Sequence, residues 1–132
     1  MPSFTVTNAQ FAEAVKAVVE ENPGRVYEAP AHQLATVTNP ATCYYVHTDP
    51  DDGDKLSPGC VIGAALHRLG LSLDEIRQCE FDNARQVLFR LFPNLSADTR
   101  DWANSVQTRQ DAKATWSEAL DYANSRIGFP QD

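Results

Sequence analysis

The stretch from residue 43 to residue 60, CYYVHTDPDDGDKLSPGC, gathers residue types that often do chemistry in proteins. It holds two cysteines, one histidine and four aspartates within eighteen positions. Three interpretations are compatible with this composition: a metal site, a thiol nucleophile with a histidine base, and an acidic turn between two elements of the core. The spacing of the residues distinguishes among them.

The aspartates superficially resemble a calcium-binding loop around Gly53, and they are Asp49, Asp51, Asp52 and Asp54. A calcium loop of that type needs its glycine at the sixth position and a bidentate glutamate at the twelfth. Counted from Asp49, the glycine is fifth and the twelfth residue is Cys60. Asp, Pro and Gly are also typical of tight exposed turns. We therefore interpret residues 49–54 as an acidic turn, and the pattern alone leaves cation binding there open.

Zinc would need ligands from the set Cys43, His47, Cys60 and His67. Cys60 and His67 are seven residues apart on an expected helix, which separates their Cα atoms by about 10.5 Å. Zinc bonds of about 2.3 Å to sulfur and 2.1 Å to nitrogen scarcely span that distance, so His67 is excluded. The other three residues lack a fourth ligand unless an aspartate of the turn serves. We predict no metal and no cofactor.

A thiol nucleophile is the remaining chemical interpretation, with Cys60 attacking and His47 as its base. A cysteine in the first turn of a helix is favoured as thiolate by the helix dipole, and a histidine at the end of a strand could lie beside it. The competing interpretation, which we prefer, is that Cys60 is a small buried apolar residue. Spacing alone leaves open whether Cys43 and Cys60 touch.

The elements that position these residues are an expected strand and an expected helix. Residues 43–47 are rich in aromatic and β-branched types, which favour a strand. Ser57 is suited to cap a helix with Pro58 at its first position, and we expect this helix to run from about 58 to 69. Apolar side chains cover most of its circumference, so it should be the central buried helix. Gly63 should permit close approach of a neighbour.

Helix start signals recur through the rest of the chain. Capping boxes are predicted at Thr7 with Gln10, at Ser72 with Glu75 and at Thr115 with Glu118, and further N-caps at Asp82 and Ser96. Residues 25–28 are expected to form a short strand, and residues 29–42 a loop. The sequence therefore predicts a single α+β domain over residues 1–132, predominantly α, with about six helices around the central one and a sheet of two or three strands.

Composition limits the partners. The chain has 132 residues and a formal charge of −7, and eight of its acidic residues against two basic ones lie in residues 1–54. Nucleic acids and anionic membranes attract clustered Lys and Arg, so we expect neither as a direct partner. No basic segment leads into an apolar run at the N-terminus, which favours a cytoplasmic protein, and three cysteines suit reduced thiols.

The run from Ser57 to Gly70, SPGCVIGAALHRLG, preceded by the Cys43 strand and an Asp/Gly turn, resembles small uncharacterised proteins of actinobacteria and their phages. In those proteins a cysteine strand leads through a short turn to a Pro-Ser-Cys-Ile-Val-Gly type of helix start. The segment Thr115–Leu120 is similar to their C-terminal helix. The present chain departs from the pattern in having Gly59 before the cysteine and a longer, more acidic turn. The resemblance implies a phage or actinobacterial origin, hence a host cytoplasm, and no catalytic activity.

Two functional hypotheses follow. The preferred one is a small acidic interaction domain, monomeric or homodimeric, that binds a host or phage protein. The alternative is a cysteine-dependent enzyme that uses Cys60 as nucleophile and His47 as base. The acidic N-terminal half and the lack of a complete catalytic set favour the first.

Overall fold

A computed structural model describes residues 2–34 and 43–132. This part of the chain forms seven helices and a two-stranded antiparallel sheet, so the protein has a small, predominantly helical α+β fold, as predicted. The elements in chain order are α1 (Asn8–Glu21), α2 (Ala31–Leu34), β1 (Val46–Thr48), β2 (Leu56–Pro58), α3 (Val61–Arg68), α4 (Leu73–Arg77), α5 (Ala84–Leu91), α6 (Ala97–Asp111) and α7 (Trp116–Arg126).

Local signals explain where most of the helices begin. The three predicted capping boxes, at α1, α4 and α7, are all present, and Ser96 caps α6 as expected. The expectation that Asp82 caps α5 is wrong. Asn83 is the cap, because its side chain accepts from the Gln86 amide while the Gln86 side chain accepts from the Asn83 amide. Such reciprocal bonds satisfy donors that a helix start would otherwise leave free.

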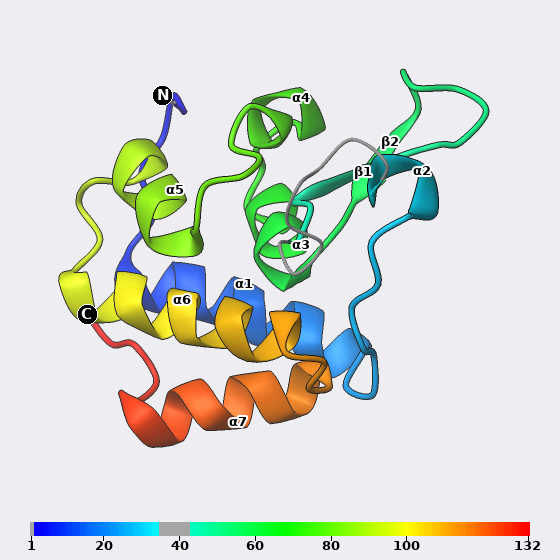
Figure 1. The fold of residues 1–132 in the computed structure, drawn as a ribbon. Coiled ribbons are helices and arrows are strands. Elements are labelled where there is room, and N and C mark those ends of the chain that lie inside the picture. The colour runs from blue at the N-terminus through cyan, green and yellow to red at the C-terminus, as the bar shows by residue number, and fades with distance from the viewer. Residues whose placement is uncertain (1, 35–42) are drawn as a thin grey trace.

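The helices surround α3. In Figure 1, α1, α6 and α7 run side by side, and α3 stands across them. Helix α3 packs against α1 and α6, while α5 and α7 each pack against α6. Five of the eight residues of α3 are buried, which confirms its central position; they are Val61, Ile62, Gly63, Ala65 and Leu66.

The start of α3 differs from the prediction. The helix was expected to begin at Pro58 with Ser57 as cap, but both residues belong to β2, and Cys60 is the N-cap. The reason is that the strand pairing continues past β2. The Gly59 amide donates to Tyr45 O at 2.9 Å and the Cys60 amide donates to Tyr44 O at 3.0 Å, so these residues are held against β1 and the helix begins only after them.

The sheet has two strands, which agrees with the expected two or three, but the strands differ in position from those expected. β1 pairs with β2 through Val46 opposite Pro58, His47 opposite Ser57 and Thr48 opposite Leu56. The strand expected at residues 43–47 is thus shifted towards the C-terminus. The strand expected at residues 25–28 is reduced to one bridge between Val26 and Thr115.

The loop predicted over residues 29–42 contains the short helix α2. Residues 35–42 of the predicted loop lie outside the described part of the chain. None of the helices in the described ranges combines the length and apolar character needed to span a membrane.

Candidate functional site

The β1–β2 hairpin presents the four aspartates of the predicted turn. It projects at the edge of the molecule, on the side away from α7 (Figure 1). Asp49 Oδ1 accepts from the amides of Asp51 and Asp52 at 2.9 and 3.2 Å, and Asp52 Oδ1 accepts from the Asp54 amide at 3.0 Å. The conformation of the turn is thus stabilised by hydrogen bonds from its own backbone amides to its own carboxylates. Within the described residues, no group of three or more His, Cys, Asp or Glu side chains is placed to hold a metal ion.

A cavity of about 680 Å³ lies at the base of the hairpin, between the hairpin and α2. Its walls mix apolar side chains with two imidazoles, a carboxylate and an ammonium group. On one wall His32 Nε2 lies 2.8 Å from Thr48 Oγ1. The lining residues are Pro30, Ala31, His32, His47, Thr48, Asp49, Pro50, Lys55, Leu56 and Ser57.

His47, the proposed base, is bound to Tyr27. The Tyr44 amide donates to the Tyr27 hydroxyl oxygen at 2.8 Å, and the same hydroxyl is hydrogen-bonded to His47 Nε2 at 2.9 Å. Burial lowers the pKa of His47, and the positive charges of Arg25 and His32 lower it further. Near neutral pH the ring is therefore uncharged, and its Nε2 is already engaged.

The outer edge of β1 is covered by one side chain from α2 and one from the turn after α4. Gln33 Nε2 donates to Val46 O at 3.1 Å, and Gln33 Oε1 accepts from the Thr48 amide at 3.0 Å. This is the pattern that one residue of a parallel strand would make opposite His47. On the same edge the Glu80 carboxylate accepts from the amides of Tyr45 and Val46, at 2.7 and 3.2 Å.

Glu80 is an unusual acid. Burial raises its pKa to about 7, although the two backbone amides and the charge of Arg77 act in the opposite direction. Its side chain also lines a second cavity, of about 430 Å³, with His32, Arg77 and the 63% exposed ring of Phe81. Sequence reasoning missed Glu80, because a lone glutamate after a short helix carries no periodic or motif signal.

The two cysteines of the opening stretch are both buried in the core. Cys43 and Cys60 are 2% and 0% exposed, and together with Gln107 and Asp111 we call them the thiol cluster. Gln107 Nε2 donates to Cys43 Sγ at 3.3 Å. A hydrogen bond with the Cys60 thiol is the largest cause that raises the pKa of Cys43 well above its usual value, followed by burial. The cluster thus holds Cys43 as a protonated thiol.

Asp111 completes the cluster from the end of α6. Burial raises its pKa to about 6, while bonds from the Gln110 amide and from Cys43 act to lower it. Gln110 also ties α6 to α3, because its Oε1 accepts from the Val61 amide at 2.9 Å. Neither residue was singled out from the sequence, where they read as the polar end of a surface helix.

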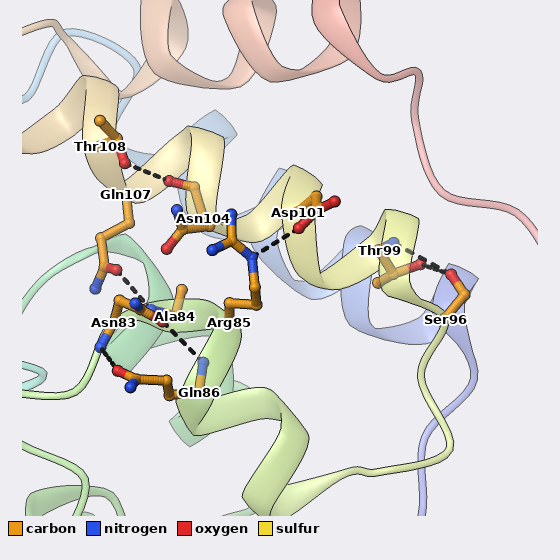
Figure 2. A network of polar contacts seen from close by, with 10 residues as sticks. All are labelled: Asn83, Ala84, Arg85, Gln86, Ser96, Thr99, Asp101, Asn104, Gln107 and Thr108. Carbon is orange, nitrogen blue, oxygen red and sulfur yellow. Dashed lines mark hydrogen bonds and ion pairs between the residues drawn. The ribbon is translucent and has the colours of Figure 1, made fainter.

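The contact between α5 and α6 holds Gln107 in place. Figure 2 shows its side-chain oxygen accepting from the Ala84 amide, at 2.7 Å, at the start of α5. Further along the same contact, Arg85 Nε donates to Asp101 Oδ1 at 2.7 Å. The amide nitrogen of Gln107 is thereby directed to the Tyr45 hydroxyl, at 2.7 Å, and to Cys43.

The predicted site residues are therefore only partly brought together. Cys43 and Cys60 are both buried in the same core, and the enclosure of the Cys60 sulfur agrees with the preferred interpretation. The His47 ring lies against Gly59, where an added Cβ would come within 3.1 Å of its Nε2, but the hydrogen bond of that nitrogen goes to Tyr27. Comparison of the chain with known protein families, with curated proteins and with solved structures finds no match.

Proposed function

We propose that this protein is an acidic interaction domain that binds a basic surface of a partner protein through the β1–β2 hairpin. The observation that supports this proposal is the group of four aspartates, three of them exposed, in a turn that is held by its own hydrogen bonds. A turn that is ordered before binding loses little conformational freedom when a partner arrives. The cavity at the base of the hairpin offers room for one side chain of that partner.

The net negative charge of the chain also supports binding to a basic partner. The formal charge of −7 and the acidic hairpin would draw in a basic surface and orient it, which raises the association rate more than it raises affinity. Lys55 is the one basic residue in the run from 43 to 60. Such binding should weaken steeply as salt is added, because exposed charges are screened over about 10 Å at 0.1 M salt.

The cysteine-dependent enzyme stays an untested hypothesis, and no specific observation favours it. The Cys60 sulfur is fully enclosed, and His47 Nε2 is hydrogen-bonded to the Tyr27 hydroxyl. A substrate would reach the thiol only after the domain had opened locally. Iodoacetamide labelling of Cys60 against pH tests this hypothesis directly.

Binding is best tested with an array of labelled peptides that place Lys and Arg around one apolar residue. The test variant is Asp51→Asn/Asp54→Asn, which removes two exposed charges that accept no turn hydrogen bond. The matched control is Glu13→Gln/Glu20→Gln, which removes two exposed charges from α1. Exposed charge pairs contribute about 0.2–1 kcal/mol each, so the hairpin variant should bind its peptides roughly 2- to 30-fold more weakly.

Fluorescence anisotropy at rising salt gives the measurement. The proposal predicts that the hairpin variant loses affinity and salt dependence while the control variant keeps both. If no basic peptide binds, or if both variants lose affinity equally, binding through this hairpin is refuted and only the net charge of the chain matters.

A further inference from the structure

Two basic side chains lack a partner among the described residues, and both line cavities beside α2. They are Lys55, in the cavity at the base of the hairpin, and Arg77, in the second cavity. All the other Lys and Arg side chains, which lie in the described ranges, make an ion pair, a hydrogen bond or a contact with an aromatic ring. An unpaired guanidinium at a cavity is unexpected in a chain of this negative charge.

We propose that the second cavity binds a small aromatic carboxylic acid, with the guanidinium of Arg77 on its carboxylate and its ring against Phe81 and Tyr44. The volume of the cavity, about 430 Å³, lies within the range of about 300–1,000 Å³ that is usual for small-molecule sites. The four aspartates of the hairpin turn take no part in this site, so it does not depend on the proposed function.

The polar groups of the cavity favour an anion over a cation. Glu80 supplies a carboxylate, but both of its oxygens already accept hydrogen bonds from the backbone amides of β1 and the residue before it. His32 Nε2 is likewise engaged, by Thr48 Oγ1. Arg77 makes no hydrogen bond or ion pair within the described residues, so its N–H donors remain for a ligand. A guanidinium binds a carboxylate through two parallel hydrogen bonds, which suits Arg77 to this role.

Two rings favour an aromatic ligand. The rings of Phe81 and Tyr44 both line the cavity, with centroids 5.9 Å apart and planes at 73°. The Tyr44 hydroxyl donates to Gln33 O at 2.7 Å, which holds that ring in place. Phe81 is 63% exposed, and its φ of 71° is a left-handed conformation that bulky residues rarely adopt. A ligand ring laid on Phe81 would bury the side chain that this backbone presents at the cavity.

Glu80 opposes such a ligand, and it makes binding depend on pH. Its ionised carboxylate repels an anion, and burial raises its pKa to about 7. The other titratable groups that line the cavity are His32, Tyr44 and Arg77. A proton on Glu80 or on His32 favours the bound anion. Binding should therefore tighten as pH falls from about 8 to about 6.

The probe is phenylacetate, titrated into the isotope-labelled full chain and followed through the amide signals in NMR spectra. Two related compounds separate its parts, because phenylacetamide keeps the ring without the charge and acetate keeps the carboxylate without the ring. We expect phenylacetate to shift the signals of residues 44–46 and 77–81 in a saturable way. It should bind roughly ten-fold more tightly than either related compound.

Variants test the two anchors separately. Arg77→Gln should weaken binding roughly ten-fold or more, because it removes the charge and the paired donors. The matched control is Lys55→Gln, which removes the other unpartnered cation and should leave binding unchanged. Phe81→Ala should also weaken binding, whereas Phe89→Ala, which removes a ring of similar exposure from α5, should not.

The proposal is overturned if phenylacetate produces no saturable shifts around the cavity, or if phenylacetamide binds equally well. It is also overturned if Lys55→Gln weakens binding as much as Arg77→Gln, or if binding does not tighten between pH 8 and pH 6. If a variant fails to fold, the three compounds and the pH series on the parent protein still decide. Binding of basic peptides is measured separately, so failure of the proposed function leaves this result unaffected.

Discussion

Replacing Gly63 by alanine should destabilise the protein, although alanine is the better helix former. An alanine Cβ at this position would lie 2.0 Å from Tyr45 O and 2.7 Å from Tyr45 C. Both atoms belong to the backbone that leads into β1, so no side-chain rotation relieves the clash. Helix α3 and the strand would have to separate, and α3 also packs against α1 and α6.

The magnitude follows from two opposing terms. Overpacking of a well-packed core costs about 1–3 kcal/mol and sometimes more. Alanine returns about 1 kcal/mol of helix propensity. Because the clash here is with backbone and exceeds 1 Å, we expect the upper end of the first term and a net loss of about 2 kcal/mol. With a urea dependence of about 1–3 kcal/mol per molar, the midpoint should fall by roughly 1 M.

Urea unfolding followed by tryptophan fluorescence measures this loss, since Trp102 and Trp116 are both buried. The matched control is Gly24→Ala, because nothing lies within 4 Å of a Cβ built at Gly24. That variant should be as stable as the parent or slightly more stable. A Gly63→Ala protein that unfolds with the parent's midpoint would refute the close contact between α3 and the strand.

Two further predictions concern the polar groups behind the hairpin. Burial raises the pKa of Glu80 to about 7 in the folded state, from an ordinary value of 4.5 in the unfolded state. Between these two pH values the folded state keeps a proton that the unfolded state has released, so the free energy of unfolding falls as pH rises from 4.5 to about 7. The parent should therefore lose about 3 kcal/mol relative to Glu80→Gln between pH 4 and 8, measured by urea unfolding; a constant difference would contradict the raised pKa. Tyr27→Phe should cost about 1–3 kcal/mol, because it strips the buried Tyr44 amide of its acceptor, whereas Tyr122→Phe, whose hydroxyl accepts from exposed Arg126, should cost little.

The sequence predicted those parts of the fold that depend on local signals. Capping boxes at Thr7, Ser72 and Thr115 place a polar acceptor and its reciprocal partner three residues apart, so the helix starts can be read directly. The apolar circumference of α3 likewise predicted its central position. Each of these signals acts within one or two helical turns, which is the range that sequence patterns capture.

The start of α3 could not be predicted, because local and distant interactions compete there. Ser57 and Pro58 form a good helix start when taken alone. The amides of Gly59 and Cys60 instead donate to the carbonyls of Tyr45 and Tyr44, which lie 14 and 16 residues earlier in the chain. Strand pairing is a tertiary interaction, and it overrides the local preference.

The sequence predicted the exposed residues of the candidate site but missed its buried polar residues. The aspartates of the turn are recognisable from composition alone. Glu80 reaches this region from the turn after α4, and Gln107 and Asp111 reach it from α6. Each looks like an ordinary surface residue until the helices are packed. Buried polar groups that satisfy one another across elements leave no pattern along the chain.

The covering of the β1 edge limits how another protein can attach to this one. A free strand edge invites a foreign peptide to join the sheet through main-chain hydrogen bonds. Here the Val46 carbonyl and the amides of Tyr45, Val46 and Thr48 are already matched by Gln33 and Glu80. A peptide could form main-chain hydrogen bonds with those groups only by displacing the side chain of Gln33 or Glu80. A partner at this hairpin must therefore be recognised through side chains. The same covering of the strand edge disfavours edge-to-edge association of several copies into fibres.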